Sequence, residues 1–205
     1  MYVKPRFSGL FYVTPMTNLL FGDLDTRAAL LPLTYTRPTA LLRCGIHTLE
    51  EKWKHFFRIE HSYLTTSYLE EKFPACIKDD NLLINPLFMP SPELAAEIEN
   101  LKPNSWLMKD SHWVAARLGE DNLKAWKNSD LKNGNQIKSL HANAFIQFPW
   151  HLFQQNKAEI KADYDRLPPQ TSFDFHASVR TIGTDIYVEE GALLINCSLN
   201  SLDGP

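Results

Sequence analysis

Short, uninterrupted apolar runs alternate with amphipathic stretches in the first half of the chain, and this alternation is the strongest constraint on its fold. Residues 18–21 (NLLF), 62–65 (SYLT) and 81–85 (NLLIN) have the length and composition of buried strands. Residues 45–57 and 67–73, which lie between them, have the apolar spacing of helices that bury one face. Strands that are apolar throughout occur in parallel sheets covered on both faces. The sequence therefore predicts an α/β fold.

The pattern is different in the second half. A Ser-Pro-Glu helix start stands at 91–93, because Ser caps a helix and Pro suits its first position. Residues 105–118 predict an antiparallel hairpin, and 139–148 a further strand. We interpret the polar stretch 119–138 as a surface excursion, and we expect a helix from Pro149 to just before the Pro168-Pro169 pair.

The tail carries a six-residue apolar period, formed by Ile182, Val188 and Leu194, with Gly183 and Gly191 at turn positions. Such a period is typical of a left-handed parallel β-helix. An ordinary β-hairpin is the alternative. Because the sequence ends after roughly one coil, we expect a β-helix that is truncated.

Composition excludes several classes of function. The net charge of −3 leaves no basic field for a nucleic acid, and no apolar run is long enough to span a membrane. Three widely spaced cysteines form neither a zinc motif nor a disulfide framework, so we expect buried thiols and a cytoplasmic location. The closest histidines, His55 and His61, are expected at a surface helix end.

Single basic residues in a turn-rich stretch are the best candidates for chemistry. Arg27, Arg37 and Arg43 follow the first predicted strand. An arginine side chain matches a phosphate group with two parallel hydrogen bonds, so the stretch suits a small phosphorylated ligand. The alternative is that Arg27 and Arg37 cap a helix or pair with Asp23 and Asp25.

Thr26-Arg27, Pro32-Leu33-Thr34 and Pro38 follow the order of a phosphate-binding loop that reads G-x-G-T-R-L-x-P-x-T-x-x-x-P-K. The chain thus resembles the sugar-1-phosphate nucleotidyltransferase superfamily. It is most similar to a divergent subgroup of Bacteroidetes-type bacteria, which resembles the uridylyltransferase half of bifunctional N-acetylglucosamine-1-phosphate enzymes. The shared motifs, LLPLTxTRP, GI-TLEEKW, LLIN, PW-LFQ-N and N-x-x-DGP, extend the resemblance over residues 17–205.

The resemblance implies a three-layer, Rossmann-like nucleotide-diphospho-sugar transferase fold with a mixed sheet, plus the start of a left-handed β-helix. It divides the chain into an extension (1–16), a nucleotidyltransferase-like domain (17–170) and a linker with the first coil (171–205). It implies transfer of a nucleotidyl group from a nucleoside triphosphate to a sugar-1-phosphate with Mg²⁺. It also implies a homo-oligomer that associates through the β-helix.

The same resemblance assigns roles to individual residues. It implies that Arg27 and Arg37 hold phosphates as catalytic residues and that Asp23 or Asp25 holds the metal. The implied substrate-binding residues are Gly22, Thr26, Thr34, Arg43, Asn85 and Asn143.

Three departures from the family pattern support a second interpretation. Only Gly22 remains of the loop glycines, Thr39 replaces the lysine, and Asn85 replaces the metal-binding aspartate. The alternative is a degenerate domain that binds a nucleotide-sugar or positions a β-helix acyltransferase without catalysis. Asn85 then closes a turn with the following proline.

Two further groups have structural interpretations. Trp106, Trp113 and Trp126 are expected in the core rather than at a sugar site. Asp163 and Asp165 are expected on a solvated helix surface, because residues two apart do not share a helix face.

Overall fold

A computed structural model describes residues 18–23, 25–129, 134–168, 170 and 173–204. The chain forms two compact units, one made of Met1–Arg43 with His47–Leu152 and the other of Cys44–Ile46 with Phe153–Pro205. The predicted extension at 1–16 lies outside the described residues.

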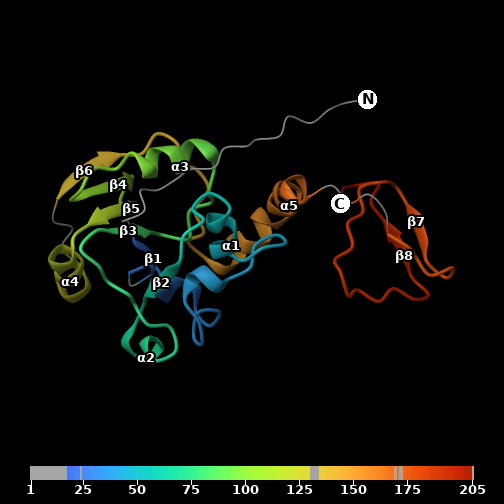
Figure 1. The fold of residues 1–205 in the computed structure, drawn as a ribbon, viewed down its shortest axis with the longest axis horizontal. Coiled ribbons are helices and arrows are strands. Elements are labelled where there is room, and N and C mark those ends of the chain that lie inside the picture. Colours follow the sequence, from blue (N-terminus) through green and yellow to red (C-terminus); the bar gives the residue numbers. More distant parts are fainter. Residues whose placement is uncertain (1–17, 24, 130–133, 169, 171–172, 205) are drawn as a thin grey trace. The chain divides into compact units, whose positions relative to one another are not determined.

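The first unit is built on a six-stranded sheet with the order β2-β1-β3-β5-β4-β6 (Figure 1). Its strands are β1 (Asn18–Gly22), β2 (His61–Leu64), β3 (Asn81–Ile84), β4 (Ser105–Lys109), β5 (His112–Leu118) and β6 (Asn135–Lys138). The pairs β1·β2, β1·β3 and β4·β6 are parallel, whereas β3·β5 and β4·β5 are antiparallel. The predicted mixed sheet and the hairpin at 105–118 are confirmed.

Helices cover both faces of this sheet (Figure 1). Successive residues of a strand point to opposite faces, so Leu19 packs with Trp53 of α1 (Leu49–Lys54) and Leu94 of α3 (Pro92–Glu99). The next residue, Leu20, packs in a second core with Leu123 of α4 (Glu120–Ser129). The result is the predicted three-layer α/β fold, in which the three tryptophans 106, 113 and 126 are core residues, as expected.

Helix starts follow their capping residues. The first helix begins at Leu49 rather than at the predicted position 45, because Thr48 and Glu51 form a reciprocal capping box. Gly45 has a φ of +82°, which a helix does not contain. The predicted cap of α3 is confirmed, since the Ser91 side chain accepts a hydrogen bond from the Leu94 N–H.

The interpretation of 119–138 as a surface excursion is wrong. This segment supplies α4 and β6, and Leu123 and Trp126 of α4 are buried three residues apart on one helix face. All four residues of β6 are exposed, so the strand has no apolar pattern to predict it. The strand expected at 139–148 is reduced to one isolated bridge between Phe88 and Phe145.

Short helical turns follow the first two strands. They are η1 (Arg27–Leu30) and η2 (Thr39–Leu41) after β1, and α2 (Ser67–Glu70) after β2. The peptide bond between Leu31 and Pro32 is cis. The first two of these turns shape the stretch that carries the candidate phosphate-binding arginines.

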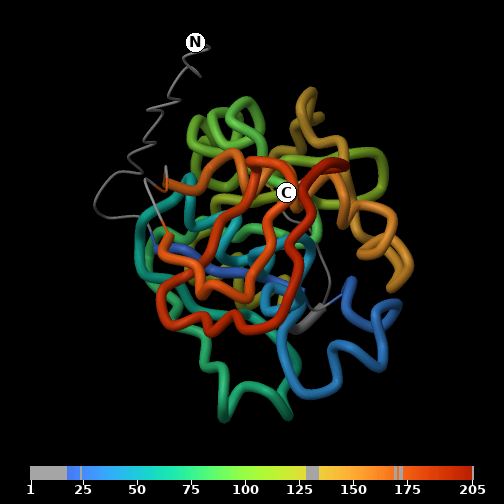
Figure 2. The backbone as a smooth tube through the Cα atoms, turned by 90° about the vertical axis from the view of Figure 1, so that its right-hand side faces the viewer, coloured from blue at the N-terminus to red at the C-terminus, as the bar shows by residue number. Residues whose placement is uncertain are grey.

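The second unit contains most of α5 (Pro149–Arg166), followed by β7 (Arg180–Ile182) and β8 (Ser198–Asn200). The two strands pair in parallel with Arg180 opposite Ser198, and their segment is red in Figure 2. The hairpin alternative is therefore wrong, because hairpin strands are antiparallel. The offset of 18 residues is three times the six-residue period. A β-helix coil remains the prediction for this segment.

Asp163 of α5 is buried, so its predicted place on a solvated surface is wrong. Its Oδ2 atom accepts a hydrogen bond of 3.0 Å from the Ile46 N–H, and its Oδ1 atom lies 3.3 Å from Arg166 Nη1. A Cβ atom on Gly45 would lie 2.6 Å from the Asp163 carboxylate. The aspartate thus anchors residues 44–46 to α5.

Candidate functional site

The parallel strands β1, β2 and β3 end on the same edge of the sheet, which we call the carboxyl edge. Asp23 follows β1, Thr65 follows β2 and Asn85 follows β3. Ligands of open α/β sheets bind outside the carboxyl ends of the strands. The structure therefore brings the loop after β1 and the predicted site residue Asn85 to one edge.

Asp23 closes the loop after β1 upon itself. Its side chain is only 2% exposed, and its Oδ2 atom accepts a hydrogen bond of 2.8 Å from the Thr39 N–H. The same oxygen lies 3.9 Å from Arg27 Nε. Burial raises the pKa of Asp23, while the Thr39 N–H, the Thr65 hydroxyl and the Arg27 charge oppose that rise. The carboxylate thus joins two parts of the loop that are 16 residues apart.

Both terminal nitrogens of the Arg27 guanidinium are bonded to protein. It is 7% exposed, and its guanidinium donates to Thr66 Oγ1 at 3.0 Å, to the Tyr68 hydroxyl at 2.9 Å and to the Thr34 carbonyl. Thr34 is fully buried and its hydroxyl donates to the Arg27 carbonyl at 3.0 Å. In this structure, the predicted phosphate ligands Arg27 and Thr34 therefore hold each other.

The other two predicted arginines are exposed in different surroundings. Arg43 pairs through its main chain with Thr48. Burial alone would raise the pKa of Glu51, but the Thr48 N–H and, less strongly, Arg43 lower it. Arg37 is exposed, and no described residue forms an ion pair or a side-chain hydrogen bond with it. Of the three arginines, Arg37 is the one whose charge is open to a ligand.

The carboxyl edge also holds the polar atoms that the fold leaves unsatisfied. Among the described residues, five buried side-chain atoms have no hydrogen bond of good geometry within the protein: Asp23 Oδ1, Thr26 Oγ1, Arg27 Nε, Thr39 Oγ1 and Thr65 Oγ1. The Thr39 and Thr65 hydroxyls still lie near enough to Asp23 to lower its pKa. Buried polar groups in native proteins nearly always have partners, and the exceptions call for an explanation. All five belong to the loop after β1 or to the residue that follows β2, so this edge is the polar centre of the fold.

Trp113 links the loops that follow β1 and β3. Its Nε1–H donates to both carboxylate oxygens of Asp25, at 2.9 and 3.0 Å. Its carbonyl accepts a hydrogen bond of 3.0 Å from Asn85 Nδ2, and Asn85 Oδ1 accepts one of 3.1 Å from the Leu87 N–H. Asn85 is fully buried. Both ends of its amide are thus used to close the turn after β3.

Gly22 permits this arrangement. A Cβ atom at that position would lie 2.9 Å from Leu83 Cδ1 and 3.0 Å from Trp113 Cη2. Contacts this short would force the neighbouring side chains to move. The glycine is therefore explained by the packing of Trp113 against β1, in addition to any contact with a ligand.

Asn143 lies in a segment that runs beside the turn after β3. The Met89 N–H donates to the Ala144 carbonyl at 2.9 Å, and the rings of Phe88 and Phe145 stack with centroids 4.5 Å apart. Asn143 itself is exposed. The segments of the two predicted asparagines, Asn85 and Asn143, are therefore neighbours, although only Asn143 has an open side chain.

The two predicted metal ligands differ in how they suit a cation. Among the described residues there is no cluster of three His, Cys, Asp or Glu side chains able to hold a metal ion. Asp25 is exposed, and it fits a magnesium ion that is held mainly by phosphate oxygens and takes one protein carboxylate. Asp23 does not fit, because it is buried beside the Arg27 cation and bonded to the Thr39 N–H.

Residues 18–171 match the family described as sugar nucleotidyl transferase. The matched range contains the whole six-stranded sheet and most of the chain. The chain belongs to the sugar nucleotidyl transferase family. The superfamily indicated by the loop is thereby confirmed, whereas the bacterial subgroup remains a prediction. No match was found among curated proteins. In the described part of this sugar nucleotidyl transferase domain, no helix is long and apolar enough to cross a membrane.

A second polar cluster of the sugar nucleotidyl transferase domain has no motif in the sequence. Glu50 of α1 accepts a hydrogen bond from the Tyr63 hydroxyl, and its Oε2 atom lies 3.3 Å from His61 Nε2. Burial would raise the pKa of Glu50, but the bonds from His61 and Tyr63 lower it. Burial and the Glu50 charge raise the pKa of Tyr63. The expected place of His61 at a helix end is wrong, because His61 lies in β2. His55 is exposed and directly follows α1, which confirms the expectation for that residue.

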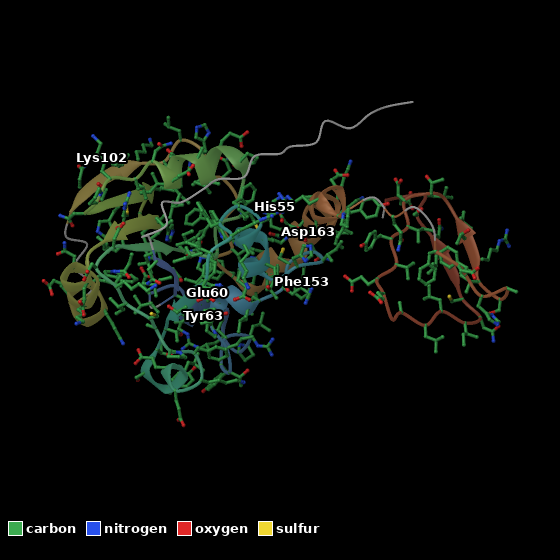
Figure 3. All side chains as sticks on the ribbon, viewed as in Figure 1. His55, Glu60, Tyr63, Lys102, Phe153 and Asp163 are labelled. Atoms are coloured by element: carbon green, nitrogen blue, oxygen red, sulfur yellow. The ribbon has the colours of Figure 1, made fainter. Side chains whose placement is uncertain are left out.

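A shallow hollow of about 570 Å³ lies beside this cluster. It is lined by Lys54, Arg58, Ile59, Glu60 and His61, and Figure 3 labels Glu60 next to Tyr63. His61 stands at the start of β2, so the hollow is on the opposite edge of the sheet from the family loop. His61 and Tyr63 are two residues apart, so in a strand their side chains lie on the same face of the sheet. This spacing was the only sequence signal for the cluster.

The expectation of buried thiols holds for one cysteine of the three. Cys44 is buried, Cys197 is half-buried and Cys76 is exposed. Cys76 follows Pro74 in the irregular segment between α2 and β3, where no secondary structure buries its side chain.

Proposed function

We propose that this chain transfers a nucleotidyl group from a nucleoside triphosphate to a sugar-1-phosphate, giving a nucleotide-sugar and pyrophosphate. The observation that carries the proposal is the family match over 18–171, which includes the loop after β1. The polar carboxyl edge, with its exposed Arg37, supports it. The base and the sugar are left open.

The reaction needs positive charge around the α-phosphate. The phosphate oxygen of the sugar-1-phosphate attacks the α-phosphorus, a new P–O bond forms, and the bond to the β-phosphate oxygen breaks to release pyrophosphate. We assign Arg37 to the phosphate oxygens, where charge increases in the transition state. We assign the exposed Asn143 to the sugar hydroxyls and Thr26, Arg43 and Gly22 to the surrounding loop.

Magnesium belongs to the same proposal. When bound to the triphosphate, Mg²⁺ supplies charge that stabilises the leaving pyrophosphate. The exposed carboxylate of Asp25 is the residue we assign to it, with the Trp113 indole N–H fixing the direction of that carboxylate.

Pyrophosphate release tests the proposal. The chain is incubated with Mg²⁺ and with pairs drawn from a panel of nucleoside triphosphates and sugar-1-phosphates. The Arg37→Gln variant should lose about a hundredfold in rate, as is usual when a transition-state charge contact is removed. Arg58→Gln is the matched control, because Arg58 is also exposed but lies at the opposite edge. Full activity of Arg37→Gln would refute the assignment of Arg37.

A second candidate is a non-catalytic domain that binds a nucleotide-sugar or positions a β-helix acyltransferase. Asn85 favours it, because the amide at the position of the implied metal-binding aspartate is buried and is hydrogen-bonded through both its nitrogen and its oxygen. Thr39 favours it too, since its N–H is bonded to Asp23 and no lysine stands there. Thermal stabilisation by a nucleotide-sugar without pyrophosphate release from any substrate pair would support this candidate over the enzyme.

A further inference from the structure

Tyr68 on α2 makes an unusual set of contacts for an exposed tyrosine. Its side chain is 57% exposed, yet its hydroxyl accepts a hydrogen bond of 2.9 Å from Arg27 Nη2. The same hydroxyl donates to the Tyr35 carbonyl at 2.9 Å. The Tyr68 ring lies over the Arg27 guanidinium, with Cζ 5.2 Å from the ring centroid. The side chain is thus held in place although little covers it.

Arg27 and Tyr68 together bond two successive carbonyls of one turn. Arg27 donates to the Thr34 carbonyl and Tyr68 to the Tyr35 carbonyl. The turn has only two internal main-chain bonds here, from Leu33 N–H to Leu30 at 3.0 Å and from Tyr35 N–H to Pro32 at 3.1 Å. The Thr34 hydroxyl adds one bond to the rest of the loop, to the Arg27 carbonyl at 3.0 Å. Arg27 and Tyr68 are the side chains from other elements that bond the turn and orient it on the domain.

Arg37 follows this turn by two residues and carries the exposed guanidinium. A long side chain delivers its charge to a defined place only if the main chain below it is fixed. Thr34 and Tyr35 are the nearest residues before Arg37 whose main chain is bonded to another part of the domain.

Arg27 is poorly suited to leave these contacts for a phosphate. Its charge lies 3.9 Å from the buried Asp23 carboxylate, and moving it would leave that carboxylate without its cation. It would also leave the Thr34 carbonyl without this donor.

We propose that Tyr68 and Arg27 are positioning residues, which hold the turn at residues 33–35 so that Arg37 faces the triphosphate. This inference rests on the proposed function, because it names the residues that orient the phosphate contact. It gives Arg27 an indirect role in place of a direct contact with phosphate, and it adds Tyr68, which no sequence motif indicates.

The test compares two tyrosine-to-phenylalanine variants. Tyr68→Phe removes the hydroxyl that bridges Arg27 and the Tyr35 carbonyl but keeps the ring. Tyr35→Phe is the matched control: Tyr35 is 63% exposed, and its carbonyl, which makes the contact, is retained. Both variants lose one hydroxyl from the same part of the surface, so they differ in the proposed contact alone.

Hydrogen exchange of the ligand-free protein gives the first measurement. Tyr68→Phe should raise the exchange rate of the Leu33 and Tyr35 amides roughly fivefold or more, as expected for the loss of a hydrogen bond that holds the turn. Tyr35→Phe should leave these rates unchanged. Equal rates in Tyr68→Phe and the wild type would overturn the inference, whether or not the protein is an enzyme.

Nucleotide binding gives the second measurement. With Mg²⁺ present, Tyr68→Phe should weaken the affinity for the triphosphate about tenfold while the midpoint of unfolding without ligand stays within a few degrees. Arg27→Lys should behave in the same way, because a lysine does not bond two acceptors with a planar fork. Unchanged affinity in Tyr68→Phe would overturn the inference and leave the proposed function intact. Absence of nucleotide binding in the wild type would instead refute the proposed function and, with it, the role assigned to the turn.

Discussion

Replacing Asn85 by aspartate tests the account of the carboxyl edge most directly. The resemblance implies an aspartate at this position, whereas the structure shows an amide that is fully buried. Asn85 Nδ2 donates to the Trp113 carbonyl and Asn85 Oδ1 accepts from the Leu87 N–H. Asn85→Asp keeps the acceptor but replaces the donor by a second oxygen, which then faces the Trp113 carbonyl oxygen.

The cost of this change follows from burial. An unsatisfied buried acceptor costs about 1–3 kcal/mol, and burying a carboxylate without a partner adds more, so we expect a loss of about 3–5 kcal/mol near neutral pH. For a chain of this length each kcal/mol lowers the unfolding midpoint by about 2–4 °C, so the midpoint should fall by roughly 10 °C. Asn143→Asp, at an exposed asparagine on the neighbouring segment, should change it by no more than a degree or two.

The loss of stability in Asn85→Asp should depend on pH in a definite direction. Burial and the facing carbonyl should raise the pKa of the introduced carboxyl above its unfolded value of about 3.9. A group whose pKa is raised in the folded state stabilises the folded protein at pH values below its unfolded pKa. That contribution is lost as the pH rises through the folded pKa. The deficit of Asn85→Asp should therefore shrink between pH 7 and pH 5, where the protonated carboxyl donates to the Trp113 carbonyl. Thermal unfolding followed by circular dichroism measures this, and a wild-type midpoint at pH 7 would refute the reasoning.

Three further predictions concern other parts of the chain. Asp163→Ala should destabilise the protein by about 1–3 kcal/mol in chemical unfolding, because the Ile46 N–H loses its acceptor, and an unchanged midpoint would contradict the anchoring role of Asp163. Glu50→Gln should destabilise the protein at pH 7 but progressively less as the pH falls below about 4.5, because the pKa of Glu50 is lowered and only its ionised form contributes to stability. A stability difference that does not change with pH would argue against this. Trp126→Ala should lower the free energy of unfolding by about 3–5 kcal/mol, because a large core side chain is removed. A chemical unfolding curve that matches the wild type would show that α4 is not part of the core.

Local patterns were sufficient for much of the architecture. The strands β1 and β3 could be predicted from their apolar runs, β2 as a short strand segment, and the start of α3 from its Ser-Pro-Glu cap, because these signals involve residues that are adjacent in sequence. The family could be predicted from the order of Thr26-Arg27 and Pro32-Leu33-Thr34, and the match over 18–171 confirms it. The six-residue period of the tail agrees with the 18-residue offset between β7 and β8.

The surroundings of each site residue depended on long-range contacts. Arg27 and Arg37 look alike in the sequence, yet one is buried against Tyr68 and the other is exposed. Asp163 is buried, and it accepts a hydrogen bond from Ile46, which is 117 residues away. A motif specifies which side chains are present, but burial and hydrogen bonding depend on which distant elements pack against them. The tertiary structure alone therefore distinguishes the arginine that holds the loop from the arginine that is open to a ligand.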